Sequence, residues 1–471
     1  MELEIPLESL VVNLSTNPPT VYSGKKLSRL VDGAAGKLHS LHLPLDASIG
    51  LVGVNSAAFM IAMLGTHKTQ HLCVPINYKL PKDKIKFCIE DSNVKFVFCD
   101  PEFKHLVPPG ITVVELGKEF EQFCNNDYLA PVGLDPDRLC MALYTSGTTG
   151  LPKKILFSFR DRFSESVKNK LLSYGGVKMK TLSANPFFHN AGINWFVSHI
   201  VRKNTIFLMP QFDAKQFLKN IEKYQITSIS VVTPMMLMML NETDLISTLN
   251  LTSIKEITFQ ASLADASTIE KVKKVFVNAV YIRNPYGLTE TGMSVFDLHP
   301  EGIPIPPGSA GYPTPLVRTK LVDDVLYVKS EDLLSRLSDS KDEYFNTRDR
   351  FRVDQQGFYY YIGRADDMLK CGGEKVFPIE IESVLDQHAC VDSSLVIGLD
   401  DSIKGQKPYA FVKLKTHIDE ADLLKYAAEN LATYQIPKRI WQVESWPLNE
   451  IGKLDKKTLV KIAQQYIQHE L

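Results

Sequence analysis

Hydrophobic positions along the first two thirds of the chain alternate between two spacings. Short runs rich in β-branched and aromatic residues are followed by longer amphipathic runs, which is typical of strands followed by helices. Repeated strand–helix–strand units imply mostly parallel sheets covered by helices. The pattern predicts strands at 49–54, 72–76, 94–99, 228–232 and 255–259, and helices at 57–64, 82–91, 213–224, 234–240 and 266–276.

The pattern changes beyond residue 310. Short strands at 325–328 and 357–361 predict a small antiparallel β unit. The last hundred or so residues mix strands with a helix at 420–431, so we expect a separate α+β domain there. We therefore expect an α/β protein whose ligands bind at the carboxyl ends of parallel strands.

Composition narrows the class of protein. The chain has 471 residues, with 53 lysines and arginines against 54 aspartates and glutamates and a formal net charge of −1. This length suffices for two or three domains with sizeable cores. A near-neutral balance argues against nucleic acid as the main partner, because binding to phosphates needs a surplus of basic residues.

The expected compartment is the cytoplasm. The seven cysteines are odd in number and show no C-x-x-C spacing, which favours a reducing environment. The sequence MELEIPLESL lacks the basic and apolar regions of a signal peptide. The longest apolar stretches, 48–64 and 229–240, are interrupted and too short for a spanning helix.

The strongest local motif is 144–154 (YTSGTTGLPKK), which follows an apolar strand. Its two inner glycines let the backbone approach a ligand closely, and its hydroxyls and N–H groups can cradle phosphate oxygens. Lys153 or Lys154 adds positive charge. The spacing differs from the Walker A pattern. A polar β-hairpin turn is the alternative interpretation, which the length of the motif disfavours.

This loop is followed by six further motifs in a fixed order. Together they resemble the motifs of the adenylate-forming superfamily, which contains acyl-CoA synthetases, nonribosomal adenylation domains and luciferases. The resemblance covers nearly the whole chain. The six motifs are 185–192 (NPFFHNAG), 286–290 (YGLTE), 347–349 (TRD), 363–370 (GRADDMLK), 372–376 (GGEKV) and 449–454 (NEIGKL).

The resemblance implies both an architecture and a reaction. The N-terminal domain, 1–365, would contain two α/β lobes and a small reduced β-barrel, and a mobile α+β domain would span 366–471. A carboxylate would attack the α-phosphate of Mg-ATP to give acyl-adenylate and pyrophosphate. The thiol of coenzyme A, or of a carrier-protein phosphopantetheine, would then accept the acyl group.

The same resemblance assigns the nucleotide to residues of several motifs. Glu290 would bind Mg²⁺, a cation that prefers carboxylate oxygen. Taken alone, Tyr286 would be assigned to core packing, and Asp349 and Arg364 to a surface ion pair. The phosphate candidates are Thr145, Ser146, Gly147, Thr148, Thr149, Gly150, Lys153 and Thr289. The adenosine candidates are Gln260, Ala261, Tyr286, Gly287, Asp349 and Arg364.

The C-terminal motifs resemble those that act in turn during the two half-reactions. Lys453 would bridge the carboxylate and the α-phosphate during adenylation. Asp366 would be the hinge about which the domain rotates. Lys370 matches a second-step lysine, or is an exposed strand lysine. Gly372 and Gly373 would leave room for the pantetheine arm.

The acid pocket is expected around His189. Amino-acid-activating relatives carry an aspartate in the 187–190 segment, which here has no carboxylate, so an acyl or aryl acid is favoured over an amino acid. His189 would line the pocket, unless it is a core histidine. Asn190 would hydrogen-bond the substrate or cap the following helix. The methionine run 235–239 would line the pocket or belong to the core.

Three departures from the family pattern leave other interpretations open. Phe259 and Gln260 replace small residues, Arg348 replaces a glycine, and the 311–347 segment is short. Arg348 makes a special backbone conformation less expected and offers a phosphate or partner contact. The departures motivate a degenerate nucleotide-binding protein as one alternative to an acid–CoA ligase. An enzyme that loads a carrier protein is the other alternative, because both ligases would use a pantetheine thiol.

Overall fold

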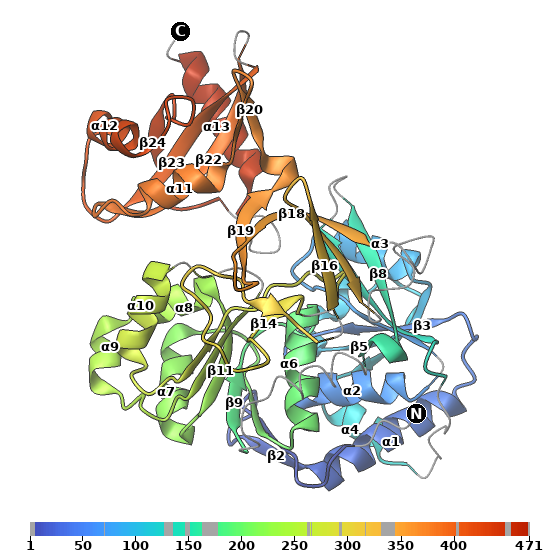
Figure 1. The fold of residues 1–471 in the computed structure, drawn as a ribbon. Coiled ribbons are helices and arrows are strands. Elements are labelled where there is room, and N and C mark those ends of the chain that lie inside the picture. The colour runs from blue at the N-terminus through green and yellow to red at the C-terminus, as the bar shows by residue number, and fades with distance from the viewer. Residues whose placement is uncertain are drawn as a thin grey trace. The chain divides into compact units, whose positions relative to one another are not determined.

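The protein consists of two compact units (Figure 1). The first contains Met1–Thr319, Val328–Phe345 and Gln355–Phe358, and the second contains Lys320–Tyr327, Asn346–Asp354 and Tyr359–Leu471. The computed structural model describes residues 5–69, 71–126, 135–146, 151–162, 178–260, 264, 266–291, 294–315, 317–330, 344–401, 405–447 and 454–469.

The first lobe of the first unit is built on a six-stranded sheet in the order β6-β5-β3-β4-β7-β8. Neighbouring strands run parallel except β8, which returns antiparallel to β7. The strands are β3 (Ser48–Val52), β4 (Leu72–Pro75), β5 (Val94–Cys99), β6 (Thr112–Glu115), β7 (Leu139–Ser146) and β8 (Pro152–Ser158).

Helices cover both faces of this sheet because each has an apolar face to bury. One core joins α1 (Gly24–Ser40), α2 (Ala57–His67) and α4 (Lys118–Cys124) to the sheet. A second core joins α3 (Lys82–Asp91) to the opposite face, where the short helix η1 (Pro101–Leu106) also packs. Ser56 caps α2 by accepting a hydrogen bond from the backbone N–H of Phe59.

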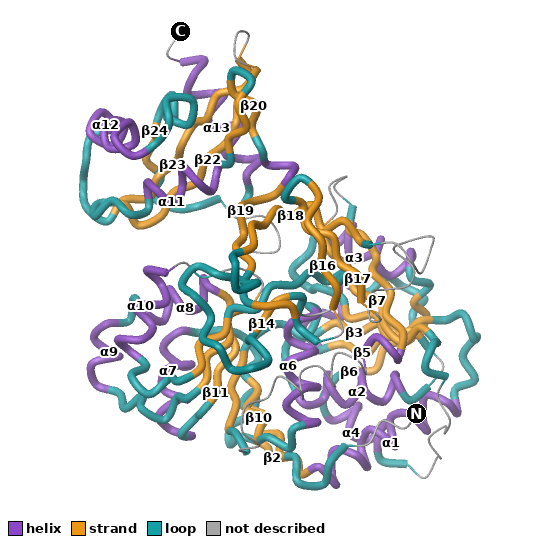
Figure 2. Tube along the Cα trace, viewed as in Figure 1, coloured by secondary structure: helices purple, strands orange, loops and turns teal. Residues whose placement is uncertain are grey.

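The second lobe is a seven-stranded sheet in the order β13-β12-β11-β9-β10-β1-β2. Helix α6 packs into the core of the first lobe, while α7, α8 and α10 bury their apolar sides against this sheet. Figure 2 shows these helices flanking the strands. The strands are β1 (Leu10–Asn13), β2 (Thr20–Ser23), β9 (Lys180–Ser183), β10 (Thr205–Leu208), β11 (Ser228–Val232), β12 (Glu256–Gln260) and β13 (Tyr281–Arg283). The helices are α6 (Asn190–Val201), α7 (Ala214–Tyr224), α8 (Thr233–Leu240), α9 (Thr243–Thr248) and α10 (Ala266–Val275).

The last hundred residues form an α+β structure within the second unit. Its sheet has the order β21-β20-β23-β22, with β24 paired to β23. Helices α11 and α12 share one core with the sheet and α13 shares another. The strands are β20 (Leu369–Cys371), β21 (Glu374–Val376), β22 (Val391–Asp401), β23 (Gly405–Leu414) and β24 (Ile440–Gln442). The helices are α11 (Pro378–Leu385), α12 (Glu420–Asn430) and α13 (Lys456–His469).

The small β unit is an open sheet in the described part of the chain, with the order β16-β17-β18-β19, rather than the reduced barrel that was expected. Its last two strands pair antiparallel, as predicted. Most of its residues belong to the second unit. The strands are β16 (Val317–Val322), β17 (Val325–Ser330), β18 (Phe345–Val353) and β19 (Tyr359–Arg364). The short strands β14 (Phe296–Asp297) and β15 (Tyr312–Pro313) pair separately.

The predicted α/β class is confirmed. The predicted helix 82–91 and strands 94–99 and 228–232 have the bounds of α3, β5 and β11. The domain boundary at Asp366 stays a prediction. Among the described residues, none of the helices has the length and apolarity that crossing a membrane requires.

Candidate functional site

The predicted phosphate loop is flanked by the two strands of the β7–β8 hairpin. Thr145 lies opposite Lys153 and donates a hydrogen bond from Oγ1 to its carbonyl oxygen, at 3.5 Å. Ser146 ends β7. The loop residues between them, 147–150, lie outside the described residues, so their role stays a prediction.

The two lysines of this motif have different surroundings. Lys154 forms an ion pair with Asp91, with 2.9 Å between Nζ and Oδ2. The hydroxyl of Tyr144 also donates to Asp91, at 2.6 Å. Burial raises the pKa of Asp91, but the hydrogen bonds from Tyr144 and Lys154 outweigh it, and the net shift is downward. Lys154 therefore anchors the hairpin to the end of α3, and the exposed Lys153 is the better candidate for a ligand contact.

The 185–190 segment is held at the carboxyl ends of both sheets by buried amides. The side chain of Asn55, which follows β3, donates to the carbonyl oxygen of Asn185 and accepts from the backbone N–H of Phe187, both at 2.9 Å. The amide Nδ2 of Asn185 lies 3.2 Å from Ser230 Oγ and 3.3 Å from Gln260 Oε1. This network joins the predicted acid segment to the predicted adenosine candidate Gln260.

The two departures after β11 play different parts. Phe259 is fully buried in the core of the second lobe. Gln260, the next residue along β12, points the other way and meets Asn185. Of the two departures from the family pattern, only Gln260 therefore changes the polar surroundings of Asn185. Ala261 lies outside the described residues.

His189 lies immediately before α6, with its ring 4.7 Å from that of Phe188 between centroids. It is half-buried rather than enclosed in a core. Asn190 does not cap α6: its Oδ1 accepts a hydrogen bond from Arg162, at 2.6 Å. The methionine run is divided, because Met236 and Met239 are core residues whereas Met238 is exposed.

The predicted nucleotide motif 286–290 follows β13. Tyr286 is buried and stacks on Phe296, with ring centroids 5.5 Å apart. Thr291 Oγ1 accepts from the backbone N–H of Leu288, at 3.0 Å, and this bond fixes the turn. Gly287, Thr289 and Glu290 lie in this turn and are partly exposed.

A buried ion triad that the motifs did not indicate lies beneath this turn. Arg283, the last residue of β13, binds Asp297 through both Nε and Nη2, and its Nη1 lies 3.1 Å from Glu256 Oε1. Burial lowers the pKa of the Arg283 guanidinium, but the two carboxylates outweigh this and raise it. The triad fixes β12, β13 and β14 to one another. A basic residue ending an apolar strand was the available sequence signal.

The second unit brings two ribose candidates together. Asp349 and Arg364 are opposite each other in β18 and β19, with 3.3 Å between Oδ1 and Nη1. The Asp349 side chain is buried and that of Arg364 is partly exposed. The geometry suits an ion pair as well as two groups that hold a diol from either side, so the ribose role stays a prediction.

Arg348 has φ +60°, in the left-handed region. The expectation that a special backbone conformation is unlikely here was wrong. The N–H of Arg348 donates to Asn346 Oδ1 at 2.8 Å, which offsets part of the cost of this conformation for a side chain with a Cβ. Its Nη1 lies 3.4 Å from Oδ2 of Asp366, the hinge candidate, and both side chains are exposed.

Three of the remaining C-terminal candidates, Lys370, Gly372 and Gly373, lie along the β20–β21 hairpin. Lys370 is exposed on β20, as the alternative interpretation also expected. Gly372 and Gly373 form the turn between β20 and β21 with φ of 63° and 92°, which explains the need for glycine. A Cβ on Gly373 would meet nothing within 4 Å, so the turn is open. Lys453 lies outside the described residues.

The fold and the ordered motifs define an adenylate-forming enzyme. The family model "AMP-binding enzyme" matches residues 10–330, and the model "AMP-binding enzyme C-terminal domain" matches residues 380–453. The chain therefore belongs to the AMP-binding enzyme family. The predicted superfamily and the predicted class, an ATP-using, AMP-forming ligase, are confirmed.

Similar proteins cover almost the whole chain. A 2-succinylbenzoate–CoA ligase of Listeria monocytogenes is 28% identical over 93% of this chain and 95% of its own length. The fatty acid–[acyl-carrier-protein] ligase ScoC of Streptomyces coeruleorubidus is 27% identical over 94% and 93%.

Solved structures share the fold. ATP-bound MatB from Rhodopseudomonas palustris has a TM-score of 0.86, 23% identity, and coverage of 97% of this chain and 96% of its own. The o-succinylbenzoate CoA synthetase of Bacillus subtilis, in complex with its acyl-adenylate, has a TM-score of 0.80 and 24% identity over 93% of each chain.

The Asn55 contacts give a first test. Asn55→Ala leaves the Phe187 N–H and the Asn185 carbonyl without their partner, at a cost of about 1–3 kcal/mol. Because these groups set the position of the segment before His189, we expect KM for the acid to rise about fivefold or more. Asn93→Ala, which removes an exposed amide bonded to Asp46, should leave KM unchanged. Equal KM values for both variants, measured in an adenylation assay, would contradict the positioning role.

The buried triad gives a second test. Asp297→Ala leaves Arg283 in a buried site with one carboxylate, and loss of one partner of a buried pair typically costs about 3–5 kcal/mol. Hydrogen exchange of the β12 and β13 amides should accelerate accordingly. Glu270→Ala removes an exposed ion pair with Lys273 in the same lobe and should leave these amides protected. Protection that survives in Asp297→Ala would refute the account of the triad.

Proposed function

We propose that the protein uses ATP to activate a carboxylic acid, acyl or aryl but not an amino acid, and transfers it to the thiol of coenzyme A. One observation carries the proposal. The family motifs of the first unit, together with Gln260, fall at the carboxyl ends of strands: 145–146 ends β7, 185–190 follows β9, Gln260 ends β12 and 286–290 follows β13. Ligands of parallel α/β sheets bind at these ends.

The chemistry explains why these residue types are needed. Adenylation brings a carboxylate against a triphosphate, so the site must supply positive charge and hydrogen-bond donors where charge concentrates in the transition state. Lys153 and the loop backbone would hold the phosphates, and Glu290 would hold Mg²⁺. Asp349 and Arg364 would bind the ribose, and Lys453 would bridge the two reacting groups.

The surroundings of His189 support an acid without an ammonium group. Phe187 and Phe188 are buried, and the 187–190 segment provides no carboxylate to pair with an ammonium. Gln260 adds an amide close to this segment. The similar ligases of Listeria and Bacillus are named for an aromatic acid, 2-succinylbenzoate, which supports an aryl or acyl substrate here.

A carrier-protein phosphopantetheine is the second candidate acceptor. One similar protein is named as an acyl-carrier-protein ligase, and the open Gly372–Gly373 turn suits either pantetheine acceptor. CoA also needs basic residues for its phosphates, but two basic side chains of the second unit, Lys407 and Arg439, pair with Asp401 and Glu420. Their charges are therefore already paired, which makes them weaker candidates for binding the CoA phosphates.

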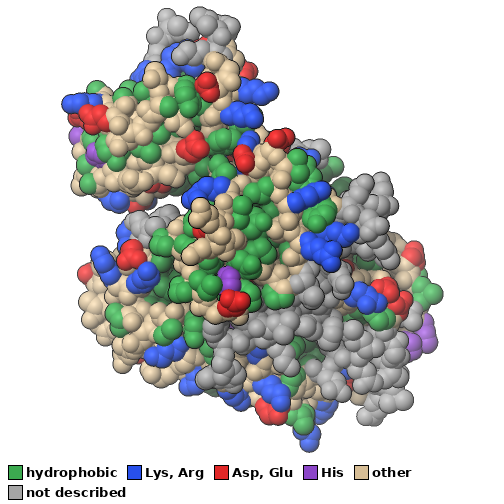
Figure 3. All heavy atoms as spheres, in the orientation of Figure 1, with side chains coloured by type: hydrophobic (Ala, Val, Ile, Leu, Met, Phe, Trp, Pro, Cys, Tyr) green, Lys and Arg blue, Asp and Glu red, His purple; other side chains and the backbone are tan. Residues whose placement is uncertain are grey.

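We also place the protein in the cytoplasm. All seven cysteines are free, which suits a reducing compartment. On the face in Figure 3, basic and acidic side chains are both scattered over the surface. This distribution supports small molecules, rather than nucleic acid, as the ligands.

The experiment that tests the proposal has two stages. A panel of alkyl and aryl carboxylic acids is screened by ATP–pyrophosphate exchange, and each acid that supports exchange is incubated with CoA and analysed by mass spectrometry. The proposal expects exchange followed by a thioester. Exchange without CoA transfer would favour the carrier protein. Absence of exchange with any acid would favour a degenerate nucleotide-binding protein.

Lys453→Ala provides a residue-level prediction. Loss of one positive charge at the transition state typically lowers the rate by ~10²–10³. We expect pyrophosphate exchange to fall by that factor while ATP affinity, measured by calorimetry, stays within about twofold. Lys457→Ala removes an exposed lysine of the same segment and serves as the control. Near-wild-type exchange in Lys453→Ala would remove Lys453 from the mechanism.

A further inference from the structure

The first unit contains a hollow that the proposed reaction does not use. Its volume is about 600 Å³, within the range of small-molecule sites. It is bounded by the segments after β3 and β5, by β1 and β2, and by helices α1 and α4. None of the residues assigned above to nucleotide, acid or thiol lines it.

The hollow lies at a position that the sheet topology marks out. The chain leaves β3 to pair β4 on one side, and then returns to place β5 on the other side of β3. The loops after the adjacent strands β3 and β5 therefore lead in opposite directions and open a crevice at the carboxyl ends of these strands. Such a switch point is where open α/β sheets bind ligands. Val54 and Asp100, from these loops, line the hollow.

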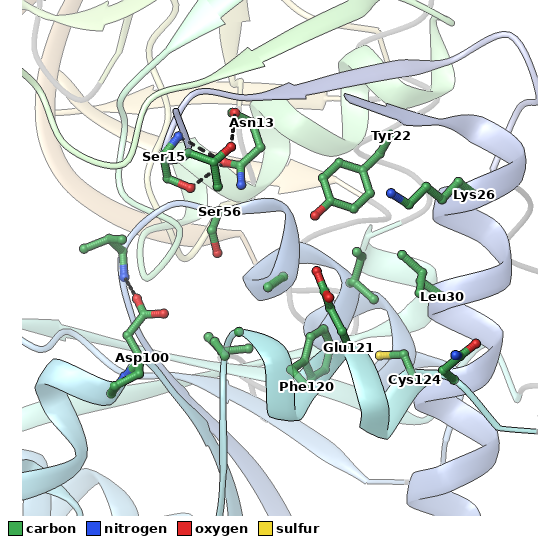
Figure 4. Close-up of a pocket in the computed structure, with 18 of the residues that line it drawn as sticks. Asn13, Ser15, Tyr22, Lys26, Leu30, Ser56, Asp100, Phe120, Glu121 and Cys124 are labelled. Atoms are coloured by element: carbon green, nitrogen blue, oxygen red, sulfur yellow. Dashed lines mark hydrogen bonds between the residues drawn. The ribbon is translucent and has the colours of Figure 1, made fainter. Parts of the chain in front are cut away.

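Acceptor groups converge on the hollow from several sides (Figure 4). Asp100 enters from the β5 loop, and one of its oxygens accepts from the Val54 N–H at 2.7 Å. Glu121 enters from α4, on a different wall. The hydroxyl groups of Ser56 and Tyr22 point into the space between these carboxylates. These groups suit a ligand that donates several hydrogen bonds and carries positive charge.

The rest of the lining combines apolar side chains, the buried amide of Asn13, and exposed groups that include Lys26 and Arg29. Leu30, Ile61, Leu116 and Phe120 are buried and form an apolar wall. Lys26 Nζ lies 4.5 Å from the centroid of the Tyr22 ring. The ligand should therefore combine a charged head with an apolar body.

We propose that this hollow is a second ligand site, which binds a small primary ammonium ion with an apolar body between Asp100 and Glu121. The ammonium would donate to both carboxylates, and the body would lie against the apolar wall. The site would operate independently of the acid-activation reaction.

The test measures binding of 2-phenylethylamine to the full-length protein by calorimetry, with the neutral isostere 2-phenylethanol as the matched ligand. We expect saturable binding of the amine and at least tenfold weaker binding of the alcohol, because a hydrogen bond to a charged group typically contributes about 1.5–3 kcal/mol. Equal affinities for the two ligands, or no saturable binding of the amine at millimolar concentration, would overturn the proposal.

Variants locate the binding. Asp100→Asn keeps an acceptor for the Val54 N–H and should weaken amine binding about tenfold or more. Glu121→Gln changes an exposed helix residue that the fold does not need, and it should weaken binding too. Glu90→Gln removes one charge from α3, away from the hollow, and should have no effect. Amine binding that is unchanged in Asp100→Asn and Glu121→Gln, or equally weakened in Glu90→Gln, would refute the site.

The pH dependence adds a separate check. Burial, assisted by the neighbouring Glu102, raises the pKa of Asp100 to about 6. Glu102, Glu121, Lys26 and Arg29 are the other charged groups of the lining. An alkylammonium stays protonated between pH 5 and 7.5, so its affinity should rise about tenfold over this interval as Asp100 ionises. Asp100→Asn should lose this rise; a wild-type affinity that does not change with pH would contradict the assignment.

Discussion

The geometry of the candidate site depends on one buried amide, the side chain of Asn55. It extends from the loop after β3, at the carboxyl end of the first sheet, to the backbone of Asn185 and Phe187, at the carboxyl end of the second. Because its donor and its acceptor are both used, its orientation is fixed, and so is the spacing of the two sheet edges. The acid segment, Gln260 and the β3 loop therefore form one polar unit inside otherwise apolar lobes.

The parts of the fold that could be predicted are those with a clean periodicity. Strands β5 and β11 are short, mostly apolar runs, and α3 buries Ile85, Cys88 and Ile89 at helical spacing, so all three were predicted with their bounds. The β1–β2 hairpin, whose strands have four residues each, was not predicted. Strand β18 was missed because it contains four charged residues, Arg348, Asp349, Arg350 and Arg352. Its antiparallel pairing with β19 stabilises it as a strand despite its polar sequence.

The candidate site divides in the same way. Thr145 lies near the end of β7 and Gln260 at the end of β12, while Tyr286 follows β13 and Asp349 lies within β18. These positions could be found because the residue types that mark them follow each other closely in the sequence. Long-range polar contacts gave no such signal. Asn55 and Asn185 are 130 residues apart, and Arg283 meets two carboxylates on other strands. The conformation of Arg348 was predicted wrongly because the hydrogen bond that its backbone N–H donates to Asn346 Oδ1 offsets part of the intrinsic cost of the left-handed region.

The central claim is that a carboxylate oxygen attacks the α-phosphate of ATP. Isotope transfer tests it directly. An acid that supports exchange is labelled with ¹⁸O in both carboxylate oxygens and adenylated, and CoA is then added. The mass of the released AMP is measured by mass spectrometry. Attack by the carboxylate leaves one labelled oxygen on AMP and one in the thioester. AMP that carries no label would contradict an acyl-adenylate and, with it, the account of this site.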